Sequence, residues 1–404
     1  MLENNSRPSR FIGLDIHRDY FVAAGVTAQQ VPVFGPQRVP NHQLPAWIAK
    51  HLTKEDAVVL EMTTNTYLFY DLLKPHVHSV LAVHPPHVAL ITRAQVKTDR
   101  KAALALAQLH AAGLLVGVWI PPQDVRDLRA LLAQRYKMVR LQTQAKNRLH
   151  SALFRHALQP PDRADPFTPE CRTWWEQLPV SELERINVLN DLDTLQFAQG
   201  QIRHLTECIG QVAAKDERVP LLVQLPGVNL LGAITLLAAI GDITRFEHAK
   251  YLVGYAGMGT RVHDSGQLHA SGRITKAGRR DLRRVMVEAA QHASRTHPHW
   301  KAELARLEPR IGREKAMVAI GRKLLVAVWH VLTDHEADRF AEATNVACSF
   351  FAFAYKVGVK HLPDGQSALA FTRQQLDRLQ IGADLQRLPW GSKTFKLPPS
   401  KLKA

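Results

Sequence analysis

The N-terminal third of the chain contains a series of short apolar segments, two of which end on an acidic residue. Residues 11–14 run directly into Asp15, and residues 58–60 run directly into Glu61. Short apolar runs bounded by turn residues are typical of strands buried in a sheet. The sequence therefore predicts strands over 10–18, 20–26, 31–38, 57–61 and 79–83.

Apolar residues at helical spacing predict three helices among these strands. Asn41 is expected to cap a helix that ends near His51. A second helix is expected over 66–73, and a third, rich in alanine and leucine, over 98–115. The resulting order of three strands, helix, strand, helix, strand and helix is that of an RNase H-like domain.

In that architecture, acidic side chains on the first strand, at the end of the fourth strand and on the last helix lie together. Asp15, Glu61 and Asp99 occupy these positions. Three carboxylates supply hard oxygen ligands for Mg²⁺, which activates the attacking oxygen and stabilises the leaving oxygen in phosphoryl transfer. Each acid alone is explained as well by a solvated strand end or, for Asp99, by a helix dipole. Together they predict a divalent metal site.

The overall charge indicates the kind of partner. The 404 residues carry a formal net charge of +16, which favours a polyanion such as nucleic acid over the alternative of a generically basic protein. Three widely spaced cysteines, Cys171, Cys208 and Cys348, argue against a disulfide framework or a structural zinc site. No signal peptide or uncharged spanning segment is evident, so we expect a cytoplasmic protein without a membrane partner.

A long helical arm is expected after Pro121-Pro122. Residues 124–156 predict one basic amphipathic helix that carries Lys146 and Arg148, and residues 191–215 predict a returning helix. The pair is interpreted as an antiparallel hairpin that acts as a spacer or dimerisation arm. Its basic face either contacts phosphates or is simply solvated.

Residues 221–252 resemble a helix-hairpin-helix. A Leu-Pro-Gly-Val turn at 225–228 precedes an apolar helix over 231–240, and a second helix is expected from Ile243. Such hairpins offer backbone N–H groups to a DNA phosphate. A plain helical hairpin is the alternative.

Residues 255–280 combine recurrent glycines with serine and arginine, and predict loop or turn backbone. Ser265 and Ser271 each precede a glycine, and a helix rich in arginine follows. A serine hydroxyl beside cations could attack a phosphodiester, or it could only shape a turn. The candidate phosphate-binding residues along the chain are Lys97, Arg100, Lys146, Arg148, Arg273, Lys276, Arg279, Arg280 and Arg283.

Helices are also expected over 282–293 and 312–332. Beyond residue 335, an aromatic cluster at 350–355 is expected to be buried. The lysines Lys396, Lys401 and Lys403 are expected to lie on a flexible arm that contacts phosphates.

Several of these segments, taken in order, resemble one family. They are Ile-Gly-Leu-Asp at 12–15, Val-Leu-Glu at 59–61, Lys-Thr-Asp at 97–99, the basic 146–150, Leu-Pro-Gly-Val at 225–228, Tyr-Ala-Gly at 255–257, Asp-Ser-Gly at 264–266 and the stretch 272–278. The ordered set resembles the DEDD transposases of insertion-sequence-one-ten type, which are relatives of the Piv and MooV invertases. The resemblance covers about residues 10–335.

The resemblance implies a site-specific, bacterial, nucleoid-associated DNA recombinase. A RuvC-like domain would bind Mg²⁺ through Asp15, Glu61 and Asp99, and Ser265 would form a covalent phosphoserine link to DNA. Ser271 is a weaker candidate because the family's serine lies nearer the Tyr-Ala-Gly turn. A structured bridge RNA would pair with donor and target DNA, and subunits would assemble as dimers and tetramers.

The implied fold class is α/β plus all-α, in four parts. These are a RuvC-like (RNase H-like) domain at 1–120, a helical coiled-coil arm at 121–215, a helical transposase domain with the serine at 216–335 and a C-terminal extension with a basic tail at 336–404.

One position departs from the family pattern. The family places a fourth acid one helical turn after the Lys-Thr-Asp motif, where this chain has Ala102. A tolerant three-acid site, a decayed copy and an engineered substitution would each explain it. The change keeps two alternatives open: a RuvC-like nuclease or resolvase in which Ser265 is structural, and a catalytically impaired nucleic-acid-binding protein.

Overall fold

The computed structural model describes residues 7–86, 98–160, 165–265 and 268–402, with the backbone alone for 262–265 and 268–271. The chain divides into two compact units, unit 1 over residues 1–122 and unit 2 over residues 123–404. Each unit is described by itself.

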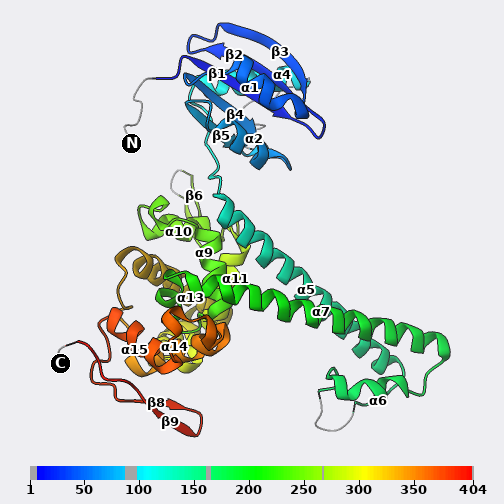
Figure 1. Ribbon diagram of the computed structural model, residues 1–404, viewed down its shortest axis with the longest axis vertical. Helices are drawn as coiled ribbons and strands as arrows, with labels where there is room; N and C mark the ends of the chain where they lie inside the picture. The colour runs from blue at the N-terminus through cyan, green and yellow to red at the C-terminus, as the bar shows by residue number, and fades with distance from the viewer. Residues whose placement is uncertain (1–6, 87–97, 161–164, 266–267, 403–404) are drawn as a thin grey trace. The chain divides into compact units, whose positions relative to one another are not determined.

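Unit 1 is built on a five-stranded mixed sheet with the order β3-β2-β1-β4-β5 (Figure 1). The first three strands are antiparallel neighbours, and β4 and β5 continue the sheet in parallel with β1. The bounds are β1 Arg10–Ile16, β2 Tyr20–Thr27, β3 Pro32–Pro40, β4 Asp56–Glu61 and β5 Ser79–Val83. The expected strands are confirmed, with ends that differ by one or two residues.

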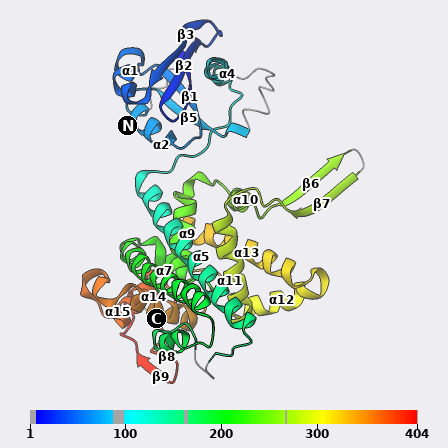
Figure 2. The ribbon, with the colours of Figure 1, turned by 90° about the vertical axis from the view of Figure 1, so that its right-hand side faces the viewer.

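Helices cover both faces of this sheet, with α1 (Leu44–His51) and α4 (Asp99–Ala111) on opposite sides (Figure 2). Side chains alternate along a strand. Ile12 and Leu14 of β1 are accordingly fully buried in one core with residues of α1 and of α2 (Thr66–Leu73). The intervening residues of β1 face α4.

The expected cap at Asn41 is wrong. A 3₁₀ turn, Asn41–Gln43, precedes α1, and the side chain of Asn41 caps neither helix. Its Nδ2 atom instead donates hydrogen bonds to the carbonyl oxygens of His17 and Arg18, at 3.0 and 2.9 Å. The amide therefore fixes the turn between β1 and β2.

Unit 2 begins with the expected antiparallel helical hairpin, made by α5 (Gln123–Arg155) and α7 (Glu182–Lys215) (Figure 1). Helix α7 starts earlier than residue 191, because the hydroxyl of Ser181 accepts a hydrogen bond from the N–H of Glu184 and caps it. Trp175 of the short α6 (Arg172–Glu176) is fully buried between the two helices' apolar side chains.

The rest of unit 2 is a helical bundle around one hydrophobic core, which extends from Ile209 to Leu397. Its helices are α8 Arg218–Val223, α9 Leu230–Ile240, α10 Ala249–Tyr255, α11 Arg280–Thr296, α12 Pro298–Ile311, α13 Arg313–Asp334, α14 Ala343–Val357 and α15 Ala368–Arg378. Within the described residues, α13 alone is long and apolar enough to cross a membrane, but half of its apolar window is buried inside the protein.

The helix expected from Ile243 is wrong. Gly241 ends α9 with a φ of 69°, only a 3₁₀ turn (Ile243–Arg245) follows, and α10 starts at Ala249. The side chain of Asp242 accepts a hydrogen bond from the N–H of Thr244, and this local bond favours the turn over a helix.

The loop expected over 255–280 is also wrong in part, because its centre is a β-hairpin. Strands β6 (Thr260–Ser265) and β7 (Leu268–Ile274) pair in antiparallel fashion, and the hairpin projects from the helices of unit 2 (Figure 2). Gly257 and Gly278 flank the hairpin, whereas Gly272 lies within β7. Gly257 and Gly278 have φ values of 65° and 141°, which glycine adopts most readily.

The expected flexible arm is wrong for residues up to 402. Strands β8 (Arg387–Trp390) and β9 (Lys393–Lys396) form a hairpin, and Leu397 is buried. The buried guanidinium of Arg373 donates hydrogen bonds to the carbonyl oxygens of Gly382 and Pro398. Lys403 lies outside the described residues. The cluster at 350–355 is buried as expected, except for Tyr355.

Candidate active site

Two of the predicted acids lie at neighbouring strand ends. Strands β1 and β4 are parallel, and Leu14 pairs with Leu60 as the last pair in register. Asp15 and Glu61 are the next residue on each strand. Because residues in register on adjacent parallel strands point to the same face, both acids face the side of the sheet that α4 covers.

Helix α4 reaches this face because β1 has a glycine beneath it. A Cβ atom at Gly13 would lie 2.1 Å from the carbonyl oxygen of Ala103 and 2.6 Å from the amide nitrogen of Ala107. No side chain fits at these distances. Gly13 therefore sets how closely the helix, and the acid at its first turn, approach the strand that carries Asp15.

The start of α4 is fixed locally. The hydroxyl of Thr98 accepts a hydrogen bond from the N–H of Lys101, which makes Thr98 the N-cap. Asp99 is consequently the first residue of the helix, where its charge interacts favourably with the helix dipole.

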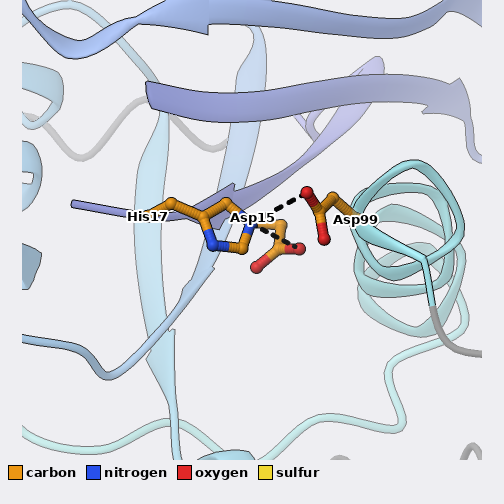
Figure 3. Close-up of side chains that lie close together, drawn as sticks. All are labelled: Asp15, His17 and Asp99. Carbon is orange, nitrogen blue, oxygen red and sulfur yellow. Dashed lines mark ion pairs between the residues drawn. The ribbon is translucent and has the colours of Figure 1, made fainter. Parts of the chain in front are cut away.

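These elements bring Asp15 and Asp99 together, with His17 between them (Figure 3). The Nε2 atom of His17 lies 3.4 Å from Oδ2 of Asp15 and 3.4 Å from Oδ2 of Asp99. One ligand atom from each of the three residues lies within 4.8 Å of the other two. Two carboxylates and an imidazole at this spacing can share one divalent cation.

Tyr20, the first residue of β2, supports the cluster from one side. Its hydroxyl donates a hydrogen bond of 2.8 Å to Asp99, and its ring packs on His17 with centroids 4.6 Å apart. The guanidinium of Arg38 lies over the Tyr20 ring, 3.8 Å from its centroid. The hydrogen bond to the Asp99 carboxylate, above all, raises the pKa of Tyr20, so the phenol remains protonated.

His17 and Tyr20 are absent from the residues that the sequence predicts for this site. A signal for His17 exists, because it follows Asp15 by two residues on the predicted strand 10–18, and residues two apart on a strand share a face. Tyr20 has no such signal, since its contact with Asp99 joins residues far apart in the chain.

Glu61 is not one of the three clustered residues. It lies at the predicted strand end, half-buried, and its role as a metal ligand stays a prediction. Ala102 lies in the second half of the first turn of α4, and its amide donates to the carbonyl oxygen of Thr98. The side chain at this position offers no ligand atom.

The serine candidates lie in the other unit. Ser265 is the last residue of β6 and pairs with Leu268, so its backbone belongs to the far end of the hairpin. Ser271 lies within β7, opposite Val262. The expected arginine-rich helix is α11, which starts at Arg280.

Several of the predicted phosphate-binding cations have protein partners. Arg148 pairs with Asp191 at 2.7 Å, and Lys146 lies over the ring of Phe167. Arg279 pairs with Asp281.

Arg283 has a structural position. It donates hydrogen bonds to the carbonyl oxygens of Ala256 and Gly278, which ties the Tyr-Ala-Gly turn to the start of α11. Arg100, Arg273, Lys276 and Arg280 are exposed, and Lys97 lies outside the described residues.

A basic groove of about 2040 Å³ lies within unit 2, between α5, α11, α14 and the turn at 226–229. Arg279 and Arg280 line it. Six further cations line it with them, and three acids: Arg129, Arg135, Arg140, Arg284, Arg295 and Lys356, with Asp281, Glu288 and Glu342. Burial above all, and also the nearby positive charge of Arg284, lowers the pKa of Arg135.

Two family models of transposases match this chain, and together they include parts of both units. A family model described as "Transposase", for DEDD transposases of IS110 type, matches residues 12–157. A second model, described as "Transposase IS116/IS110/IS902 family", matches residues 219–305.

Curated relatives agree with these matches. The transposase for insertion sequence element IS1111A of Coxiella burnetii is 26% identical over 336 residues, which is 82% of this chain and 91% of that protein. The pilin gene-inverting protein of Moraxella bovis is 26% identical over 335 residues, 80% of this chain and 95% of that protein. The insertion element IS110 uncharacterized 43.6 kDa protein of Streptomyces coelicolor is 28% identical over 143 residues, 35% of each chain.

The chain is thus a transposase, an enzyme of DNA recombination. It belongs to the IS110-type family of transposases.

Proposed function

We propose that this transposase cuts and rejoins DNA strands at a divalent metal site formed by Asp15, Asp99 and Glu61, with Ser265 as the nucleophile. The observation that carries the proposal is the meeting of Asp15 and Asp99 at the end of β1 and the start of α4. The strand order β3-β2-β1-β4-β5 supports an RNase H-like, RuvC-like domain. The carboxylate ligands suit Mg²⁺.

A metal ion at this site would stabilise negative charge on the reacting phosphate. The carboxylates of Asp15 and Asp99 would supply ligand oxygens, and the hydrogen bond from Tyr20 orients the carboxylate of Asp99. The oxygen of Ser265 would form a bond to phosphorus as the bond to one DNA oxygen breaks. The serine proton passes to solvent, and the released DNA oxygen gains a proton to become a hydroxyl end.

The two halves of this chemistry lie on different units of the chain, and the resemblance to the IS110-type family supports their meeting through assembly of several copies on nucleic acid. The acids belong to unit 1 and Ser265 to unit 2. We propose a homo-oligomer in which acids and serine from different copies meet. The basic groove and the exposed cations at the start of α11 would contact donor DNA, target DNA and a guide (bridge) RNA through their phosphates.

The decisive test is a covalent protein–DNA adduct. We expect the wild-type protein, with its guide RNA and Mg²⁺, to form an adduct with DNA that survives SDS, and Ser265→Ala to abolish it. Ser271→Ala, a serine on the neighbouring strand, should keep the adduct. Cleavage by Ser265→Ala without any adduct would instead establish a RuvC-like nuclease in which water attacks.

Restoring the absent acid is expected to strengthen the metal site. Ala102→Asp places a carboxylate one turn after Asp99, on the adjacent part of the helix surface. Because affinity for hard cations rises with the number of charged ligands, Mg²⁺-dependent cleavage should increase roughly tenfold at limiting Mg²⁺.

Gln108→Glu is the matched control for this change. It adds the same charge to α4 on the face about half a turn away from Asp99. Cleavage should remain unchanged. An unchanged rate in a folded Ala102→Asp protein would show that the missing acid does not limit activity.

A further inference from the structure

We propose that His17 is a nitrogen ligand of the metal ion, which makes the site a mixed carboxylate–imidazole site. The inference deepens the proposed function and rests on its metal site. It concerns a residue outside the three acids and names the class of cation that the site prefers.

The first support is the position of the imidazole. His17 is the first residue after β1 and lies two residues beyond Asp15. Its Nε2 atom lies 3.4 Å from Oδ2 of Asp15 and 3.4 Å from Oδ2 of Asp99. Ligand atoms at adjacent corners of an octahedral site with bonds of about 2.1 Å lie about 3 Å apart. The observed spacing leaves a position close to all three atoms.

The second support is the hydrogen bonding of that atom. Nε2 is buried from solvent, yet it has no hydrogen-bond partner of good geometry, although both carboxylates lie within ion-pair distance. A single N–H points in one direction and so cannot serve two oxygens on either side. A cation between the three atoms would satisfy all of them at once.

The third support is that the ring is held in this orientation. Tyr20 packs on one side of it, and Tyr20 is itself held by the hydrogen bond to Asp99 and by Arg38. Figure 3 shows the ring nitrogen directed toward the carboxylates of both acids. Side chains that support a ligand in this way are typical of built metal sites.

The fourth support is the shortage of acids. Helix α4 has Ala102 one turn after Asp99, and its next positions to Ala111 contain no carboxylate. His17 supplies a further protein ligand from the strand side. The site can therefore reach four protein ligands, His17 with Asp15, Asp99 and Glu61.

A nitrogen ligand changes which cation the site prefers. Imidazole favours first-row transition ions, whereas an all-oxygen site favours Mg²⁺. We therefore expect Mn²⁺ and Co²⁺ to bind more tightly than Mg²⁺. His17→Asp, which restores an all-oxygen ligand set, should narrow that difference.

Pulsed EPR of bound Mn²⁺ tests the assignment directly, because it detects a coordinated ¹⁴N nucleus. The full-length protein with one Mn²⁺ per chain is expected to show imidazole nitrogen coupling. His17→Gln should lose it and bind Mn²⁺ at least about tenfold more weakly. His42→Gln, an exposed histidine of the same unit, should behave as the wild type.

The outcomes separate this inference from the proposed function. Wild-type protein whose bound Mn²⁺ shows no nitrogen coupling overturns the role of His17 and leaves the acidic metal site in place, whatever the folding of the variants. Nitrogen coupling that persists in His17→Gln would also overturn the role of His17 and leave the acidic metal site in place. Mn²⁺ binding that is unaffected by Asp15→Asn would overturn the proposed metal site itself.

Discussion

Asp99→Asn is expected to lower strand cleavage about a thousandfold while the protein stays folded. A metal ligand contributes several kcal/mol to stabilising the reacting phosphate, and each 1.4 kcal/mol changes a rate about tenfold. Asparagine keeps the size of the side chain and an oxygen that can accept the hydrogen bond from Tyr20. The measurement is the single-turnover cleavage rate at saturating Mg²⁺ or Mn²⁺.

Asp19→Asn gives the matched control. Asp19 lies in the turn between β1 and β2. Its side chain is 86% exposed, and its carboxylate lies 4.0 Å from the guanidinium of Arg18, which is also exposed. The same change of charge there should leave cleavage within about twofold, since exposed ion pairs contribute little. Equal losses in both variants would assign the effect to net charge and contradict a specific role for Asp99.

Gly13→Val is expected to destabilise unit 1 by roughly 3 kcal/mol or more, at the upper end of the cost of overpacking. The new side chain would meet the backbone of α4 at Ala103, which cannot move aside without shifting the whole helix. The thermal transition of unit 1 should fall by about 10 °C in calorimetry. Because Asp99 moves with α4, Mn²⁺ affinity should fall as well.

Gly35→Val provides the comparison on the same sheet. Gly35 lies on β3, and no atom lies within 4 Å of a Cβ atom placed there. Valine suits a strand, so the transition should stay within about 2 °C of the wild type. If Gly13→Val and Gly35→Val had the same transition temperature, the close approach of α4 to β1 would not be required for stability.

The elements of unit 1 could be predicted closely from the sequence because each has its own local signal. Helix α2 and strand β5 have the bounds expected from apolar periodicity alone. The acids could be placed by topology, since parallel neighbours bring strand ends together. The need for a glycine at position 13 could not be predicted, because the backbone that approaches it belongs to α4, far along the chain.

The errors come from places where local chemistry competes with composition. Asn41 has the identity of a cap but bonds across to the β1–β2 turn. The glycines of 255–280 suggest a loop, while residues 260–265 and 268–274, Gly272 among them, form β6 and β7. Helix α12 (Pro298–Ile311) was not expected over its length, because histidine and proline at its start obscure the apolar spacing.

The candidate site divides in the same way. The positions of Asp15 and Glu61 at strand ends could be predicted from the sequence. In the structure, Asp99 lies close to one of them, Asp15. The imidazole between them depends on rotamer and packing against Tyr20, which sequence spacing does not specify. A residue that completes a site across elements is found only when those elements are assembled.

The single core of unit 2 has a consequence for how the protein is made. Its apolar side chains come from as early as Ile209 and as late as Leu388 and Leu397. The apolar helix α13 therefore leaves the ribosome before the segments that cover part of it have been synthesised. A nascent chain in this interval exposes apolar surface and is a substrate for chaperones, so premature stop codons upstream of residue 388 should yield protein that is degraded, not a partly active enzyme.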